Sequence, residues 1–423
     1  MATIRVLTED DLPAVTELFG RVYSERHWIS PAACESYFRE MLFDNPWRDL
    51  QIPSWVAEQH GRICGVYAVM PRRMLLRGRS LRVAVGCQFF VDPDQHNSLT
   101  AMQLAKACLS GPQDLTLADG ASDKARRMWV GIGGTASLLY SFHWTRPLRP
   151  ARYLLSLLEE HAAFPRLLRF AARLPCALVD ALSARLRPNR FYRETSELVE
   201  DALDSATMLA HLPDVLRGYA LQPVYDARTL DWLLDQIARK RHHGELRARA
   251  VRDGERRLIG WYLYYVRHGR IGEVIQIAAL DGSFDLVLQR LLADAWEHGA
   301  TALRGRLDPR FAPELSQRHC WLRTDNTWTL IHSRRADVLA AFHQGDAFAS
   351  RLEGEWWLRF LGEGEARRSM HCARFGIARP NPLAPSSART PGWSSCQDSS
   401  FPAIHLPVGH TNRTWARRSR KRT

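Results

Sequence analysis

The chain has 423 residues, of which 46% are hydrophobic and 24% are charged, and its formal net charge is +13. This length favours two domains, each with enough apolar residues for a sizeable core. No run of about 18 uninterrupted apolar residues occurs, which argues against a transmembrane helix, and the N-terminal residues do not have the pattern of a signal peptide.

The positive charge is concentrated at the C-terminal end of the sequence. Residues 366–423 contain eleven Lys and Arg and one acid, whereas the remaining residues contain 47 basic and 44 acidic side chains. A nucleic-acid partner is therefore not expected. Because the same segment is rich in Pro, Ser and Arg and has no hydrophobic periodicity, we predict a disordered basic tail at 366–423.

Cysteine and histidine usage predicts no disulfide framework and no metal site. The eight cysteines are scattered and form no CxxC pair, which is typical of reduced thiols in a cytoplasmic protein. The adjacent pairs His242-His243 and His319-Cys320 have no spaced partners that would complete a four-ligand set.

Taken in chain order, the first 146 residues predict a strand, two helices and a run of strands. Thr8 and Asp11 form a capping-box pattern before a helix at 9–23, and Ser30-Pro31 begins a second helix that ends near residue 43. The predicted strands are 4–6, 55–59, 62–69, 74–76 after an interruption at Pro71, and 81–91.

The central strand is followed by a polar loop and an amphipathic helix that ends at Leu109. A strand that opens onto a helix N-terminus creates an anion site, because the first backbone N–H groups of the helix have no partner within it. A further strand at 114–117, a helix at 123–132 and a closing strand at 138–144 complete this unit.

Residues 147–224 are punctuated by prolines and are predicted to form a helical connector. The segment Arg166–Leu174 is basic and amphipathic, and such a helix can lie on an anionic membrane. The alternative, which we favour, is a connector helix packed on one domain with its Arg side chains in water.

From residue 225 the pattern restarts. We predict helices at 227–239 and 284–298 and strands at 246–252, 257–262, 274–279, 302–307 and 328–332. The segment Arg257–Tyr262 echoes Arg62–Tyr67, which indicates a diverged internal repeat. Asp281 and Asp285 flank the start of the helix at 284, and acids repel phosphate, so this second unit is predicted to be non-catalytic or to face the substrate.

Two motifs of the first unit resemble the GNAT superfamily of acyl-CoA N-acyltransferases, and more distantly its Eis-type and Fem-type branches. Val91-Asp92-Pro93 with Gln95, Ser98 and Thr100 resembles the strand end and pyrophosphate loop of that family, with Ser and Thr in place of glycines. Residues 122–133 keep the spacing of the next family signature, with Ala125, Met128 and Gly133 matching.

The resemblance implies an α/β (α+β) fold with two GNAT-like mixed-sheet domains, 1–146 and 225–365, joined by the helical connector 147–224. It also implies acetyl-CoA as co-substrate, with no metal. The residues implied in binding acetyl-CoA are Phe90, Val91, Gln95, His96, Asn97, Ser98, Leu99, Thr100, Ser122 and Trp129. Ser122 stands for the family Asn, and Trp129 for a Tyr that protonates the leaving thiolate, which indole cannot do at neutral pH.

Acyl transfer from a thioester needs a polarised carbonyl, a neutral amine and a protonated leaving group. The resemblance assigns the first role to a backbone N–H near Phe90 or Val91. Glu58 and Asp119 are candidates for deprotonating the amine, and Tyr140 and His143 for the lost acid. Each of these four also has a simpler explanation, as a solvated, capping or core residue.

Two functions from different classes follow. The first is an acyl-CoA-dependent N-acyltransferase, most simply an N-acetyltransferase, that acts on an amine of a small molecule or peptide. The second is a degenerate, non-catalytic GNAT pair that serves as a binding or scaffolding module. The strand–loop–helix spacing favours the enzyme, whereas Trp129, Ser98 and Thr100 favour the module.

Overall fold

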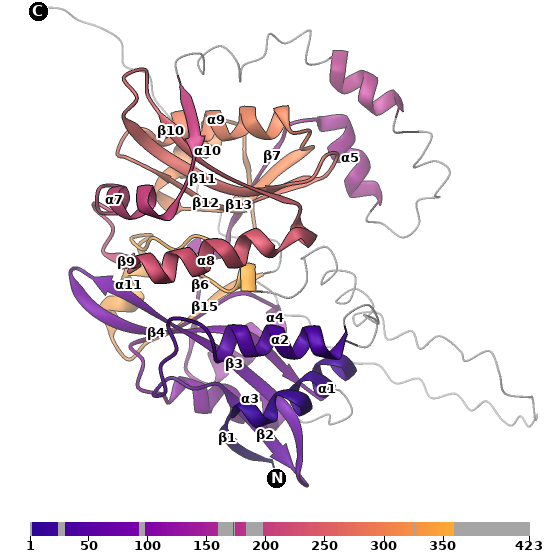
Figure 1. Ribbon diagram of the computed structural model, residues 1–423, viewed down its shortest axis with the longest axis vertical. Helices are drawn as coiled ribbons and strands as arrows, with labels where there is room; N and C mark the ends of the chain where they lie inside the picture. The colour runs from indigo at the N-terminus through magenta and orange to yellow at the C-terminus, as the bar shows by residue number, and fades with distance from the viewer. Residues whose placement is uncertain are drawn as a thin grey trace, which may run out of the picture. The chain divides into compact units, whose positions relative to one another are not determined.

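The computed structural model describes residues 2–23, 30–92, 98–159, 172, 174–182, 198–324 and 327–358, all within one compact unit, Met1–Arg368. The predicted tail at 366–423 and most of the basic segment 166–174 lie outside the described residues. Two mixed sheets form the framework of this unit (Figure 1). The fold class predicted from the sequence, two mixed-sheet α/β units, is confirmed.

The first sheet is formed mainly by the N-terminal third of the chain. Its path is β1 (Thr3–Val6), β2 (Trp55–Gln59), β3 (Arg62–Leu76), β4 (Arg79–Val91), β5 (Leu115–Ala121), β15 (Trp328–His332) and β6 (Thr135–Ser137), and β9 (Leu221–Pro223) pairs with β3. All of these pairings are antiparallel except that of β4 with β5.

The second sheet repeats this order of pairing. Its path is β8 (Val199–Ala202), β10 (Glu245–Arg252), β11 (Leu258–Val266), β12 (Ile271–Ala279), β13 (Ala302–Arg306), β7 (His143–Pro147) and β14 (Trp321–Arg323). Again only one pairing, β12 with β13, is parallel. The internal repeat predicted from the sequence is therefore present as matched topology.

Helices occupy matched places in the two repeats. The first two strands of each path are separated by two helices, and the parallel pair by one: α1 (Leu12–Val22), α2 (Pro31–Leu42) and α3 (Ser98–Leu109) in the first repeat, α7 (Ser205–Val215), α8 (Ala227–Arg239) and α9 (Phe284–Glu297) in the second. Further α-helices are α4 (Asp123–Gly131), α5 (Pro150–Glu159), α10 (Ala312–Gln317) and α11 (Ala336–His343), and residues 174–182 are also helical. Short 3-10 helices lie at Glu9–Asp11, Leu139–Ser141, Arg241–His243, Pro309–Phe311 and Trp356–Leu358.

The repeated glycine of the two echoed segments has the same structural cause in both sheets. A Cβ on Gly65 of β3 would lie 2.8 Å from Leu104 of α3, and a Cβ on Gly260 of β11 would lie 2.8 Å from Val287 of α9. In each repeat a helix therefore crosses the sheet closely at this position, and at Gly260 the Ala278 carbonyl of β12, 2.4 Å from such a Cβ, excludes a side chain as well.

Each sheet borrows one strand from the other repeat. β7 pairs with β13 and β14 of the second sheet, although the sequence predicts that residues 138–144 close the first unit. In return β15 pairs with β5 and β6 of the first sheet. The predicted closing strand is thus wrong: residues 139–141 are a 3-10 helix, and the following residues leave for the other sheet.

The predicted connector supplies strands as well as helices. Besides α5 and α7 it contains β8, which pairs with β10, and β9, which pairs with β3, so it joins both sheets. The boundaries 1–146, 147–224 and 225–365 stay predictions. What the structure adds is that strand membership crosses them.

Pro71 does not interrupt the sheet as predicted; it lies inside the continuous strand β3 and pairs with Ala84 of β4. On the other edge of β3, pairing with β2 ends at Tyr67 and pairing with β9 begins at Met74. Pro71 falls in this gap, where a strand tolerates a residue without an N–H.

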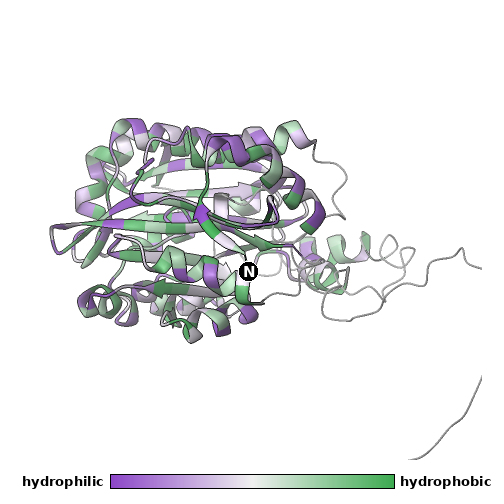
Figure 2. Ribbon diagram, turned by 90° about the horizontal axis from the view of Figure 1, so that it is seen from below, coloured by the Kyte–Doolittle hydropathy of each residue, from purple (hydrophilic) through white to green (hydrophobic). Residues whose placement is uncertain are grey.

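The largest hydrophobic core is shared by both repeats. It contains residues of α1, α2 and β3 together with residues of α7, α8, β11 and β12, and α8 is drawn between the two sheets in Figure 1. On the opposite face of the first sheet, α3 and α4 enclose a separate core around Leu104 and Trp129. Figure 2 shows hydrophilic stretches on the outer helices, whereas hydrophobic residues follow the strands.

Candidate functional site

The first candidate site is the place where β4 and β5 separate, which we call the first groove. The two strands pair at only three positions, the last being Val85 with Leu117, and then separate. β4 continues to pair with β3 as far as Val91, with a bulge at Cys87. In the described part of the chain, the β4 edge that faces β5 therefore has no strand partner beyond Val85, and its backbone groups can bind an extended ligand.

β4 ends at Val91, on the side where the two strands have separated, and α3 begins seven residues later at Ser98. Of the predicted acetyl-CoA residues, Phe90 is buried in the main core and Val91 is half-buried. Leu99 is exposed. The Thr100 hydroxyl is buried and has no hydrogen-bond partner among the described residues.

Gln95, His96 and Asn97 lie outside the described residues, as does the side chain of Ser98. These predictions therefore stay predictions.

Ser122 and Trp129 have clear structural roles. The Ser122 hydroxyl caps α4 by accepting a hydrogen bond from the Ala125 N–H at 3.2 Å. The Trp129 indole is 2% exposed and its N–H donates to the Ile331 carbonyl at 3.1 Å, which ties α4 to the borrowed strand β15. A Cβ on Gly134 would clash with this indole at 2.1 Å, so the glycine leaves room for it.

The two carboxylates predicted as bases are both held by arginines. Glu58 on β2 accepts a hydrogen bond from Arg5 at 2.7 Å, and Arg5 also pairs with Asp11. Asp119, at the β5 side of the groove, is 1% exposed and forms an ion pair with Arg306 of the second sheet. Asp119 also accepts the backbone N–H of Glu355.

The two residues predicted as acids lie apart from the groove edge. The Tyr140 hydroxyl donates to the Ala347 carbonyl at 2.6 Å and accepts the Ala347 N–H at 2.9 Å. Burial raises the pKa of Tyr140 well above its usual value, which weakens it as an acid at neutral pH. His143 is buried on β7, in the second sheet.

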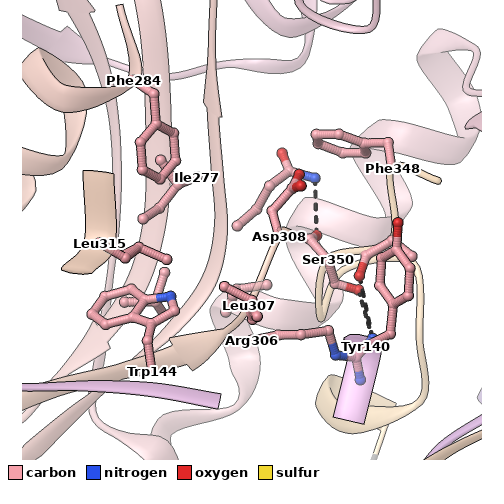
Figure 3. A pocket seen from close by; sticks show the side chains of 14 residues that line it. Tyr140, Trp144, Ile277, Phe284, Arg306, Leu307, Asp308, Leu315, Phe348 and Ser350 are labelled. Atoms are coloured by element: carbon pink, nitrogen blue, oxygen red, sulfur yellow. Dashed lines mark hydrogen bonds between the residues drawn. The ribbon is translucent and has the colours of Figure 1, made fainter. Parts of the chain in front are cut away.

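The second repeat has an equivalent groove between β12 and β13. Their parallel pairing ends at Glu273 with Arg304, and β12 has a bulge at Ile275. A cavity of about 30 Å³ lies here, lined by both strands and by residues 348–350. Figure 3 shows Phe284, Ile277, Leu315 and Trp144 on one side and Phe348, Ser350 and Tyr140 on the other.

Asp308 is the carboxylate of this cavity. It accepts a hydrogen bond from the Tyr219 hydroxyl at 2.6 Å and one from the Arg310 N–H at 3.1 Å. Burial raises the pKa of Asp308 to about 6. Nothing in the sequence pattern singled out Asp308, because an Asp before Pro at a strand end is also an ordinary helix cap.

The chain itself fills much of the second groove. We call residues 346–358 the closing segment. The Arg351 N–H donates to the Ile275 carbonyl at 3.1 Å, and the fully buried Arg351 side chain contacts Glu273 at 2.8 Å. This backbone bond falls on the bulge of β12, the counterpart of Cys87 on β4, so the closing segment occupies the edge that a ligand would need.

Within the described residues, no cluster of three or more His, Cys, Asp or Glu could hold a metal ion. Nor is any helix in that part of the chain long and apolar enough to cross a membrane.

Comparison with known proteins finds solved structures with a similar fold. No protein-family model and no curated protein matches the sequence. A solved structure of a conserved protein of unknown function from Enterococcus faecalis V583, described as a probable N-acyltransferase, is 9% identical with a TM-score of 0.50, covering 79% of this chain and 73% of that one. A GCN5-related N-acetyltransferase from Anabaena variabilis ATCC 29413 is 12% identical, also with a TM-score of 0.50, covering 81% of this chain and 75% of that one.

At these identities the likeness concerns the fold. The resemblance to the GNAT superfamily noted in the sequence is confirmed at that level.

Proposed function

We propose that the protein is an acyl-CoA-dependent N-acyltransferase that binds acetyl-CoA in the first groove and acylates an amine of a small molecule or peptide. The observation that carries this proposal is the separation of β4 and β5 after Val85, which leaves a strand edge beside a helix start. Within the part of the chain that the structure describes, the closing segment takes the corresponding edge of the second repeat, so the proposal places the ligand in the first.

The residues of the first groove fit an extended ligand with amides and phosphates. Backbone groups of β4 beyond the bulge can pair with amides, and an N–H near Phe90 or Val91 can polarise the thioester carbonyl. The N-terminal N–H groups of α3 can receive the pyrophosphate. Acetyl-CoA would supply the activated acyl group.

The four acid–base candidates stay predictions within this proposal. Glu58 and Asp119 are held by Arg5 and Arg306, so amine deprotonation through water is the simpler route. A cytoplasmic location and the absence of a nucleic-acid partner are also part of the proposal.

The alternative is a non-catalytic pair that binds a ligand or scaffolds a complex. One observation favours it: Trp129, at the position of the family tyrosine, is buried and hydrogen-bonded within the core. Both functions share the fold, so binding of acetyl-CoA separates them at the first step.

The test is isothermal titration of the full chain with acetyl-CoA, for the wild type and for Ser98→Asp. Aspartate at the start of α3 is compatible with the helix, but its charge opposes a pyrophosphate. We expect affinity to fall at least about tenfold, or roughly 1.4 kcal/mol. Ser283→Asp is the matched control, because Ser283 is the N-cap residue of the equivalent helix α9, and this substitution should not affect binding.

Circular dichroism establishes that each variant is folded. Equal affinities of folded wild type and Ser98→Asp would remove the pyrophosphate assignment. A loss confined to Ser283→Asp would move the site to the second repeat. No detectable binding by the wild type would favour the scaffold.

A further inference from the structure

Among the described residues, one buried cation in the first repeat, Arg72, has no hydrogen-bond or ion-pair partner. Arg72 lies on β3, opposite Val83 of β4, and is 7% exposed. All three nitrogens of its guanidinium are buried, and none has a hydrogen-bond partner in the described part of the chain. The other buried arginines of the core, Arg306 and Arg351, both form ion pairs.

Aromatic rings hold the Arg72 guanidinium in place. Its central carbon lies 3.7 Å from the centre of the Trp47 ring and 5.6 Å from that of Trp357. Stacking on a ring occupies the face of a guanidinium and leaves the N–H groups at its edge available, in the fork that matches a carboxylate.

A small cavity lies beside Arg72, and Glu353 is the only acid among the residues that line it. Both carboxylate oxygens of Glu353 already accept hydrogen bonds from other groups. The Glu353 carboxylate accepts hydrogen bonds from the Tyr225 hydroxyl at 2.6 Å and Gln276 at 3.1 Å through one oxygen. Through the other it accepts the Ser350 N–H at 2.7 Å and hydroxyl at 2.6 Å. Glu353 contributes negative charge nearby but forms no ion pair with Arg72 within 4.0 Å.

The cavity beside Arg72 lies at the point where β4 and β5 separate. Val85 and Leu117 line it, and these two residues form the last β4–β5 pair before the first groove opens. Since α3 follows the Val91 end of β4, a ligand that extends along β4 from the start of α3 has its other end near Val85. The Arg72 cavity therefore adjoins the Val85 end of the first groove, beyond the thioester position proposed near Phe90 and Val91 as seen from α3.

From these observations we infer that Arg72 is the anchor of a binding site for a carboxylate group. Water could satisfy the N–H groups but not the charge, whereas a carboxylate supplies two acceptor oxygens and the counter-charge together. The occupant we assign is the carboxylate of the acceptor amine, and this one step rests on the proposed function.

Entry requires the closing segment to shift. The cavity is about 10 Å³, room for one water-sized group, and Glu353 and Trp357 beside Arg72 both belong to that segment. Burial lowers the pKa of Arg72 to about 10, so the side chain is still charged at neutral pH.

The test needs no coenzyme A. Thermal unfolding of the full chain is followed with increasing acetate, at ionic strength held constant with sodium chloride, and with acetamide as the neutral isostere. We expect acetate, but not acetamide, to raise the wild-type melting temperature saturably by a few degrees. Arg72→Met should abolish the response, and its melting temperature without acetate should equal or exceed that of the wild type.

Arg72→Lys keeps the charge without the fork and should respond more weakly than the wild type. If Arg72→Met does not fold, saturation-transfer NMR of acetate on the wild type and Arg72→Lys decides instead. Equal responses in all variants, or no acetate response in the wild type, would overturn the inference. An acetate response without acetyl-CoA binding would leave the site standing and remove only the acyltransferase proposal.

Discussion

Asp119 and Arg306 occupy equivalent positions in the two repeats and form an ion pair with each other. Leu117 of β5 and Arg304 of β13 form the last parallel pairs of their sheets. Asp119 lies two residues after Leu117, and Arg306 lies two residues after Arg304. Both side chains are nearly fully buried, with relative exposures of 1% and 5%. Because equivalent residues of the two repeats contact each other, the approximate twofold axis that relates the repeats passes close to this ion pair. The pair joins the two sheets.

This relationship predicts a large effect of breaking the pair. Asp119→Ala leaves Arg306 buried beside the Ala349 and Ser350 carbonyls without its carboxylate. We expect the free energy of unfolding, measured by urea denaturation, to fall by about 3–5 kcal/mol. Asp119→Leu combined with Arg306→Met should recover most of that loss, because apolar replacement removes both charges.

Asp123→Ala is the control for the first prediction. Asp123 pairs with Arg126 and Arg127 on the exposed side of α4, and such pairs contribute at most about 1 kcal/mol. Similar losses for Asp119→Ala and Asp123→Ala would show that the inter-sheet pair is no stronger than a surface one.

The second prediction concerns Trp129. Replacement by Phe keeps most of the ring volume but removes the N–H that reaches Ile331. We expect a loss of about 1–3 kcal/mol in unfolding free energy, with acetyl-CoA affinity unchanged within a factor of two. Trp321→Phe, at an indole that is 53% exposed on β14, should change stability by less than about 0.5 kcal/mol.

A tenfold loss of acetyl-CoA affinity in Trp129→Phe, with unfolding unaffected, would contradict this assignment. It would return Trp129 to the ligand site that the sequence resemblance implied.

The third prediction concerns pH. The pKa of Asp308 is raised on folding from 3.8 to about 6, so the folded state binds this proton more tightly than the unfolded state. Stability from this group is therefore fully present below about pH 4 and is lost as pH rises to about 6. A shift of this size corresponds to at most about 3 kcal/mol.

Asp308→Asn removes this contribution. Urea denaturation between pH 4 and pH 6 should show a smaller decline in stability for Asp308→Asn than for the wild type. Parallel profiles for the two proteins would mean that Asp308 titrates normally and that its cavity is wetter than its burial indicates.

The local elements of this protein could be predicted because their signals are local. The capping box of Thr8 and Asp11 forms as expected, and Ser30 caps α2 ahead of Pro31. The helix 227–239 and the strands 55–59 and 328–332 have the predicted bounds. Helix starts depend on side chains within three residues of the end, and strands on alternation over a few residues, so one stretch of sequence is enough.

The repeat was visible in the sequence for the same reason. Gly65 and Gly260 each mark a strand that a helix crosses closely, and the residues on either side of each glycine keep the strand pattern. The family resemblance of the strand, loop and helix spacing predicted an anion site at the start of α3, but not the separation of β4 and β5 after Val85.

Only the tertiary structure decided which sheet each late strand joins. The edges of β5 and β13 can pair with any strand of suitable length. The apolar pattern of β7 or β15 does not specify which of the two edges the strand joins. The exchange pairs β7 with β13 and β15 with β5, strands that are far apart in the sequence. The sequence interpretation therefore predicted a closing strand of the first unit at 138–144, whereas residues 139–141 form a 3-10 helix and His143 and Trp144 belong to the second sheet.

For the candidate site as well, the sequence indicated some residues, and only the tertiary structure showed their partners and their burial. Asp119 was visible as an acid at a strand end, but its partner Arg306 lies 187 residues away and became its neighbour only through folding. Arg72 lies at a buried position of β3, beside Pro71, which was predicted to interrupt the strand. Nothing in the sequence pattern therefore indicated that Arg72 is buried. Whether a charged residue is buried, and whether anything neutralises it there, depends on what the rest of the chain packs against it.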